Sequence, residues 1–169
     1  MAIIVEDGTI VTGSNSFITR ADYIAFAESI GVTITDDVTA DEQLIKAGNF
    51  INAHENNLKG TLVERDQSMA YPRHDLVIDG WYWLSTEITA QVIDAQIYLA
   101  LDLNAGEDLY NRSQNPNLAT KREKIDGAVE VEYAVGGNQT QELKRTSKAD
   151  SYMSALTNSS SMFTTLVRA

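Results

Sequence analysis

The sequence predicts a mainly α-helical protein of the α+β class: a small helical bundle with a β-hairpin and an extended C-terminal arm. Three observations support this prediction. Apolar residues recur at helical spacing in several segments, and the broadest stripe lies near the middle of the chain. The pair Asp126-Gly127 lies between alternating residues, which is a strong short-range signal of a hairpin. A serine-rich stretch precedes an apolar chain end.

The N-terminal part contains a turn signal and then the first helix. Asp7-Gly8 lies between short apolar runs, which predicts a hairpin. Thr19 can cap a helix that has Asp22 in its first turn, and Gly31 is a stop signal. We therefore expect a helix over residues 20–30.

Two further helices follow the first along the chain. Thr39 with Glu42 three residues later forms a capping box, and the apolar spacing that follows predicts a helix over about 40–55. Ser85 and Thr86 offer caps for the strongest helix, which we expect over about 87–105. Its stripe is broad enough for a central position in the core.

The segment between these helices has no clear period. A short helix is expected from Arg65 to Ala70, and it ends before Pro72. Asp79-Gly80 predicts a turn, and the aromatic run Trp81–Leu84 follows it. Such a dense aromatic group is typical of a loop anchored on a core, although an aromatic ligand-binding box is the alternative.

The C-terminal third carries the predicted hairpin and the arm. We place the hairpin near residues 119–134, with Val129, Val131 and Tyr133 on one face. The chain then divides into a helical body, 1–135, and a segment, 136–169, that contains a linker, a short helix near 149–157 and the arm. The apolar chain end requires a surface that buries it, either a partner or the chain's own body.

Charge is distributed unevenly along the chain, whose formal net charge is −11. Residues 1–118 carry 18 acidic and 6 basic side chains, whereas residues 119–169 carry 6 acidic and 7 basic ones. Phosphate binding requires clustered Lys and Arg, so the acidic body is not expected to bind nucleic acid over its general surface. Solvated acidic faces are the simplest interpretation.

No pattern of catalytic or ligand-binding residues emerges from the sequence. The chain has no cysteine, and its two histidines, His54 and His74, adjoin acids in sequence, where side chains on a helix do not face each other. The acids between Asp36 and Glu42 lack the spacing of a calcium loop. We therefore predict no enzyme, no catalytic residue, no cofactor and no metal. We also expect no membrane span and no signal peptide.

Several segments, in order, resemble the head–tail connector (adaptor, or head completion) proteins of tailed bacteriophages, some of which are labelled DnaT-like. Tyr71 stands where tryptophan is common in that family, and Thr89 where proline is common. The resemblance covers roughly residues 10–135 and rests on four segments: Gly13–Phe17, Gln67–Arg73, the apolar helix from Ile88 to Ala100, and Lys121–Tyr133 with its Val129-Glu130-Val131-Glu132-Tyr133 run.

The resemblance implies a structural virion protein at the head–tail junction, made in the host cytoplasm. It implies a homo-oligomeric ring of about twelve copies under the portal protein, a platform for a tail or nozzle protein, and a conduit for genomic DNA at ejection without specific binding. Under it, Val129, Val131 and Tyr133 would lie at subunit contacts or pack on the helical bundle. The residues expected to dock on the portal protein lie in the arm: Met162, Phe163, Leu166, Val167 and Arg168.

A single-stranded-DNA-binding replication accessory protein is the alternative function. It predicts salt-dependent DNA binding through basic side chains, which are scarce in the body. The basic residues available for it lie towards the C-terminus: Lys121, Arg122, Lys124, Lys144, Arg145 and Lys148.

Overall fold

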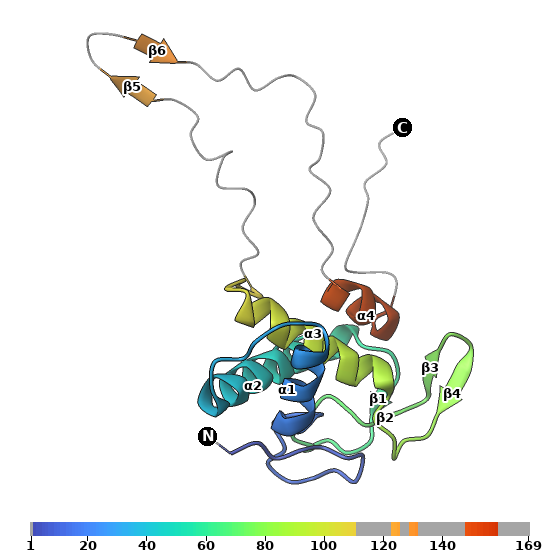
Figure 1. The fold of residues 1–169 in the computed structure, drawn as a ribbon. Helices are drawn as coiled ribbons and strands as arrows, with labels where there is room; N and C mark the ends of the chain where they lie inside the picture. The colour runs from blue at the N-terminus through green and yellow to red at the C-terminus, as the bar shows by residue number, and fades with distance from the viewer. Residues whose placement is uncertain (1, 111–122, 126–128, 132–147, 159–169) are drawn as a thin grey trace, which may run out of the picture.

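The computed structural model describes residues 2–110, 123–125, 129–131 and 148–158 (Figure 1). Within these ranges, four α-helices and short antiparallel strand pairs confirm the α+β class. The helices are α1 (Arg20–Ser29), α2 (Asp37–Ala53), α3 (Ala90–Asn104) and α4 (Lys148–Leu156), with the 3-10 turn η1 (Glu55–Asn57). The strands are β1 (Thr61–Leu62), β2 (Arg73–His74), β3 (Leu76–Ile78), β4 (Trp81–Trp83), β5 (Glu123–Ile125) and β6 (Val129–Val131).

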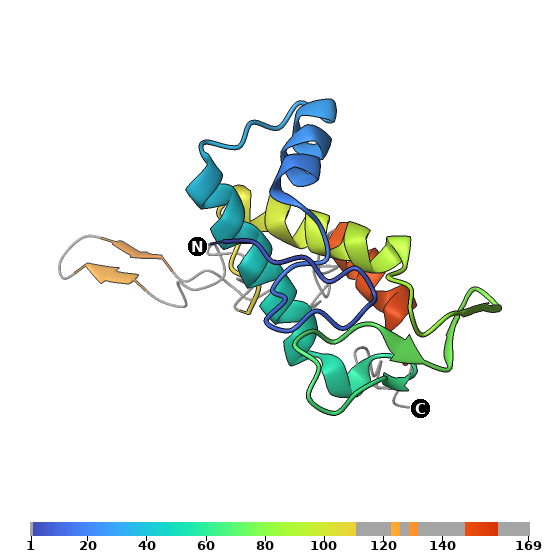
Figure 2. The same ribbon diagram turned by 90° about the horizontal axis from the view of Figure 1, so that it is seen from below.

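The N-terminal loop does not form the hairpin expected at Asp7-Gly8. Val5 instead forms a parallel bridge with Ser16, and the loop between them winds around the buried carboxylate of Glu6. Glu6 accepts hydrogen bonds from the backbone N–H groups of Gly8, Ile10 and Val11 at 2.9–3.0 Å. This side chain satisfies the donors that a hairpin would have paired, so the turn signal is overridden. Figure 2 shows the loop, in dark blue, crossing the face of the helical body.

Helix α1 lies where the sequence predicts it. The Thr19 hydroxyl accepts the backbone N–H of Asp22 and donates to its carboxylate at 2.6 Å, as an N-cap does. Tyr23 is fully buried on this helix, and its hydroxyl donates to Gln43 of α2 at 2.8 Å. Gln43 in turn donates to Asn104 at the end of α3, so one polar chain connects three helices.

Helices α2 and α3 contain the predicted cores, but their starts differ from the prediction. Asp36, rather than Thr39, caps α2, because its carboxylate accepts both the N–H and the hydroxyl of Thr39. Thr89, rather than Ser85 or Thr86, caps α3. Asp36 and Thr89 have the extended backbone conformation that an N-cap residue adopts, and this selects them over the residues that the sequence predicts.

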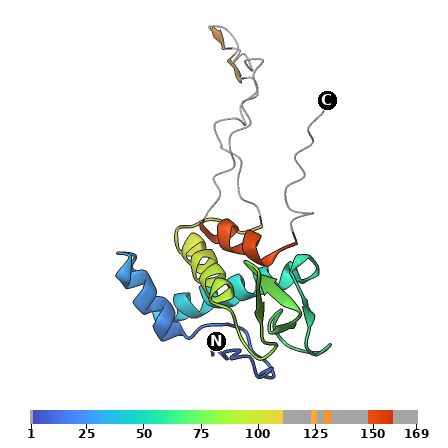
Figure 3. The same cartoon turned by 90° about the vertical axis from the view of Figure 1, so that its right-hand side faces the viewer.

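The core forms around α3, which packs against both α2 and α4 (Figures 1 and 3). Gln96 is fully buried in this core and makes hydrogen bonds in two directions. Its amide accepts the backbone N–H of Phe17 at 2.8 Å and donates to the carbonyl of Leu44 at 2.9 Å. A buried amide satisfied in this way connects the N-terminal loop to two helices.

Helix α4 agrees with the short helix expected near 149–157. Ala149, Met153 and Leu156 are buried in the same core cluster as α2 and α3. Tyr152 stacks on Tyr98 of α3 with ring centroids 5.5 Å apart. Lys59 donates to the carbonyl of Ala155 at 2.7 Å, which connects the end of α4 to the loop after η1. Helix α4 is therefore part of the packed body.

The segment before β2 is not the short helix expected between Arg65 and Ala70. The Gln67 side chain accepts the backbone N–H groups of Val63 and Glu64, each at 3.0 Å. Its amide nitrogen donates to the carbonyls of Met69 and Pro72. The Gln67 side chain thus makes hydrogen bonds to backbone groups before and after it in the chain. Because these groups bond to a side chain, they are not available for the backbone hydrogen bonds of a helical turn.

The backbone pairing of β5 with β6 confirms the predicted C-terminal hairpin. Strand β5 pairs with β6 in antiparallel register, with Lys124 opposite Glu130 and Ile125 opposite Val129. The turn residues 126–128 and Tyr133 lie outside the described residues.

Candidate functional site

The most conspicuous surface feature is the β3–β4 hairpin, which projects from the body (Figures 1 and 2). Its two strands pair from Leu76 opposite Trp83 to Ile78 opposite Trp81. Asp79 and Gly80 both have positive φ, at 52° and 83°, which is typical of the tight type I′ turn of two-residue hairpins. The predicted turn is confirmed, and it holds the hairpin tip in a defined geometry.

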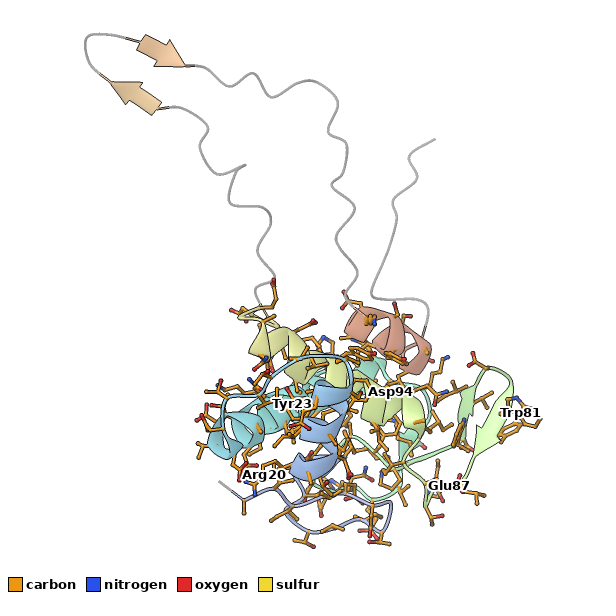
Figure 4. All side chains as sticks on the ribbon, in the orientation of Figure 1. Arg20, Tyr23, Trp81, Glu87 and Asp94 are labelled. Carbon is orange, nitrogen blue, oxygen red and sulfur yellow. The ribbon has the colours of Figure 1, made fainter. Side chains whose placement is uncertain are left out.

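The aromatic run on this hairpin divides into an anchor and an exposed tip. Trp83 packs against the core, as expected, together with the buried Leu76 and Ile78 of β3. Trp81 and Tyr82, however, are 76% and 83% exposed, and Leu84 is 64% exposed. Figure 4 shows Trp81 pointing outward at the end of the hairpin. The expectation that the whole group anchors a loop is therefore wrong for the tip.

Large exposed aromatic side chains on a projecting hairpin are unusual enough to indicate an interaction site. An aromatic ring buries about 150–250 Å² when it is covered. At about 25 cal/mol per Å², covering each ring is worth a few kcal/mol. We call the exposed residues Trp81 and Tyr82, beside the turn of this hairpin, the aromatic tip.

An open depression of about 520 Å³ lies at the foot of the same hairpin. It is built from the N-terminal loop, the end of β4 and the segment that leads into α3. The lining residues are Val5, Glu6, Asp7, Phe17, Trp83, Thr86, Glu87, Ile88 and Ile93. The lining combines apolar residues with the acidic residues Glu6, Asp7 and Glu87. We call this surface the basal depression.

The N-terminal loop contributes the acidic side of the basal depression. A Cβ atom at Gly8 would overlap the carbonyl oxygen of Thr86, so only glycine permits the loop to approach the segment before α3 this closely. The hydroxyl and N–H of Thr9 donate to Asp7 at 2.6 and 3.0 Å. These hydrogen bonds hold the pKa of Asp7 below its ordinary value, so this side chain is ionised at neutral pH.

Most basic side chains of the described body are engaged within the molecule. Arg20 pairs with Asp37 and Asp41, and Lys46 pairs with Glu42. Arg73 is buried, and its guanidinium donates to the carbonyls of Ala70 and Gly60. Such contacts leave little positive charge on the body for a phosphate backbone.

The basic residues named for DNA binding are only partly described. The Lys148 ammonium lies 5.2 Å from the centre of the Tyr98 ring, a cation–π geometry within the body. Lys124 lies on β5, opposite Glu130. Lys121, Arg122, Lys144 and Arg145 lie outside the described residues.

The two histidines lie on different elements, His54 after α2 and His74 on β2. His54 follows α2, and its Nδ1 lies 2.8 Å from the carbonyl oxygen of Phe50. His74 pairs with Thr61 in the β1–β2 ladder. Among the residues that the structure describes, no group of three or more His, Asp or Glu side chains could hold a metal ion. Nor does any described helix combine the length and apolar character of a membrane span.

Most of the portal-docking and subunit-contact residues that the resemblance implies lie outside the described residues. Met162, Phe163, Leu166, Val167 and Arg168 are outside the described ranges, and so is Tyr133. Val129 and Val131 lie on β6, with β5 as their backbone partner. Their assignment to subunit contacts stays a prediction. The sequence interpretation missed the aromatic tip as an exposed surface, although the Asp79-Gly80 turn beside Trp81 was a usable signal.

Comparison with known proteins identifies a family for this chain. A family model described as "Putative DnaT-like ssDNA binding protein" matches residues 1–169. No curated protein and no solved structure matches the chain. The family description names binding to DNA and no catalytic activity, in keeping with the expectation of a non-enzyme. Because the match spans the whole chain, the protein belongs to this DnaT-like family.

Proposed function

We propose that this protein is a structural head–tail connector of a tailed bacteriophage, and that it assembles as a ring of about twelve copies under the portal protein. The proposal rests on the resemblance of four ordered segments to connector proteins, and exposed aromatic side chains on an acidic helical body support it. Exposed aromatic side chains favour protein contacts. The acidic surface suits a wall past which DNA moves, because like charge prevents adhesion.

The proposal places the protein in the virion, between the portal protein and a tail or nozzle protein. The arm residues Phe163, Leu166 and Val167 would dock on the portal protein, as the resemblance implies. Strand pairing at the β5–β6 hairpin offers a further edge for contacts between neighbouring subunits. A ring uses such contacts head to tail, so that each copy repeats the contact of the last.

The decisive experiment is the mass of the complex formed with the portal protein encoded in the same genome, measured by mass photometry. A discrete increase equal to about twelve copies of the 18.6-kDa chain is the expected result. A folded protein that leaves the mass of the portal unchanged would contradict the connector function.

A single-stranded-DNA-binding function is the second candidate, and two observations favour it. One is the family description, and the other is the exposure of Trp81 and Tyr82, on which bases could stack. The acidic rim of Asp7 and Glu87 near the hairpin foot counts against it. Fluorescence anisotropy with labelled oligonucleotides decides the matter: the connector function predicts no change at low salt, and salt-sensitive binding would favour this candidate.

A further inference from the structure

We infer that the aromatic tip recognises positively charged side chains, arginine above all, on the surface of a partner protein. The inference goes beyond the connector function, because it names the chemistry of the surface that covers Trp81 and Tyr82. It rests on the β3–β4 hairpin alone, so it stands or fails independently of the ring and of the portal protein.

The aromatic tip keeps two large rings in solvent at a defined place. Antiparallel pairing of β3 with β4 holds its backbone, and Leu76 and Ile78, each 1% exposed, fix the hairpin on the core. Within the described part of the chain, neither Trp81 nor Tyr82 pairs with another aromatic ring or with a cation. The negative face of such a ring attracts cations, and tryptophan does so most strongly.

Carboxylates accompany the rings on this hairpin. Asp79 belongs to the same four-residue turn as Trp81, so the Cα atoms of the two residues lie within about 7 Å of each other. Asp75 lies just before β3, and both acidic side chains are exposed. No ion pair among the described residues engages either of them. A cation that stacks on a ring of the tip can therefore also meet a carboxylate.

The charge of the surrounding sequence determines which partner fits. Residues 75–110 contain no Lys and no Arg, and they carry these acidic residues: Asp75, Asp79, Glu87, Asp94, Asp102, Glu107 and Asp108. The phosphates of a nucleic acid would be repelled there, whereas a basic protein surface is complementary. Arginine fits better than lysine, because its guanidinium is planar, weakly hydrated and stacks on aromatic rings.

Nuclear magnetic resonance of the full ¹⁵N-labelled chain tests the inference. The indole N–H signals of Trp81 and Trp83 report on the tip and on the hairpin base, and Trp81→Phe assigns them. The probe is acetyl-arginyl-leucyl-arginine amide, and the matched control peptide carries citrulline, which has a similar shape and no charge, in place of both arginines. The arginine peptide should shift the Trp81 signal and leave that of Trp83, which packs against the core, in place. No shift of Trp81, or an equal shift with the citrulline peptide, would overturn the inference.

Two variants that each remove one negative charge separate the tip from the overall charge of the protein. Asp79→Asn acts at the tip, and asparagine tolerates the positive φ of this position, which is 52°. Glu28→Gln acts at an exposed position on α1, which lies away from the hairpin in Figures 1 and 3. The Kd of the arginine peptide should rise about 2- to 5-fold for Asp79→Asn and stay unchanged for Glu28→Gln. Equal effects of the two changes would overturn the inference.

Removing the larger ring tests the aromatic half of the site. Trp81→Ala should raise the Kd of the arginine peptide about 2- to 5-fold, as expected for an exposed cation–π contact, whereas Trp81→Phe should retain part of the affinity. Trp81 is 76% exposed, so both variants should stay folded. Unchanged affinity of Trp81→Ala would also overturn the inference.

The outcomes separate this contact from both candidate functions. Oligothymidylate that shifts the Trp81 signal would identify a nucleic acid as the occupant and overturn the inference. A twelve-copy complex on the portal without a response of Trp81 to the arginine peptide would retain the connector function and reject the contact. The expected response in a chain that does not bind the portal would retain the contact and reject that function.

Discussion

Glu6 illustrates how one side chain organises a loop in this protein. Its carboxylate is 1% exposed and accepts from three backbone N–H groups and from the Ser14 hydroxyl at 3.1 Å. Four donors around one carboxylate satisfy groups that would otherwise be buried without partners. The same loop provides Val5 and Asp7 to the basal depression, so this buried acid shapes the candidate site indirectly.

Glu6→Gln should destabilise the protein by about 1–3 kcal/mol, because the amide nitrogen would face backbone donors that need an acceptor. Urea unfolding followed by circular dichroism measures this loss. Glu64→Gln, at an exposed position, is the control and should unfold at the same urea concentration as the original chain. Equal midpoints for all three proteins would show that the loop does not depend on the carboxylate.

Gly48 of α2 is a second position at which a small change in a side chain should affect stability. Alanine is favoured over glycine in a helix by about 1 kcal/mol, so propensity predicts a more stable α2. A Cβ at Gly48, however, would lie 2.9 Å from the backbone oxygen of Asn15 and 3.2 Å from the end of the Met69 side chain. The Asn15 backbone is held through its own N–H, which donates to the carbonyl of Ile4 at 2.9 Å, so a shift of its oxygen would disturb this hydrogen bond.

Gly48→Ala should therefore lower the melting temperature, and Asn49→Ala should leave it unchanged or raise it. Asn49 is exposed on the same helix, so its replacement gains helix propensity without a contact. Thermal unfolding by calorimetry measures both. A more stable Gly48→Ala variant would mean that α2 and the Asn15 backbone separate readily.

At the level of elements, α4 completes the core formed by α2 and α3. Met153 and Leu156 are buried, and the chain after α4 is connected to the body through Asn158. The Asn158 N–H donates to the carbonyl of Asn57 at 2.9 Å, and its side chain donates to that of Leu58. The described contacts of the body thus extend as far as residue 158.

Deletion of residues 159–169 should leave the body folded and abolish binding to the portal protein. The deletion keeps α4 and the Asn158 contacts, and it removes the apolar residues that the resemblance assigns to docking. Calorimetry checks the fold, and mass photometry with the portal protein checks the binding. Portal binding by the shortened chain would refute the role of the arm. A large loss of stability would favour the alternative in which residues 162–169 pack on their own body.

At the level of the whole molecule, net charge determines how copies meet. Each chain carries a formal charge of −11, so two copies repel each other at low ionic strength. A contact between copies that buries the exposed Trp81 or Tyr82 gains mainly from apolar burial, which salt does not weaken. Salt therefore has opposite effects on the two candidate functions.

Raising the salt concentration from about 0.05 to 0.5 M should strengthen self-association, because the Debye length falls to a few ångströms. Binding of single-stranded DNA would instead weaken as counterions compete. Sedimentation velocity across this range measures the first effect, and anisotropy measures the second. Self-association that weakens as salt rises would show that opposite charges, rather than apolar surfaces, hold the copies together.

Much of the helical architecture follows from local sequence. The helix cores, the Thr19 cap and the hairpin turn at Asp79-Gly80 depend on periodicity and on residues adjacent in the chain. Helix starts were harder to predict, because Asp36 and Thr39 are both good caps and only the path of the incoming chain selects one. The same competition explains why Thr89, and not Ser85, caps α3.

The sequence by itself thus determined the fold class, the order of the helices, the acidic character of the body and the resemblance on which the connector proposal rests. The tertiary structure alone decided that Trp83 packs inward while Trp81 and Tyr82 face solvent, and that Glu6 is buried. Exposure depends on which surfaces other segments cover, and those segments are distant in sequence. The basal depression has the same origin, because residues 5–17 meet residues 83–93 only in the folded chain.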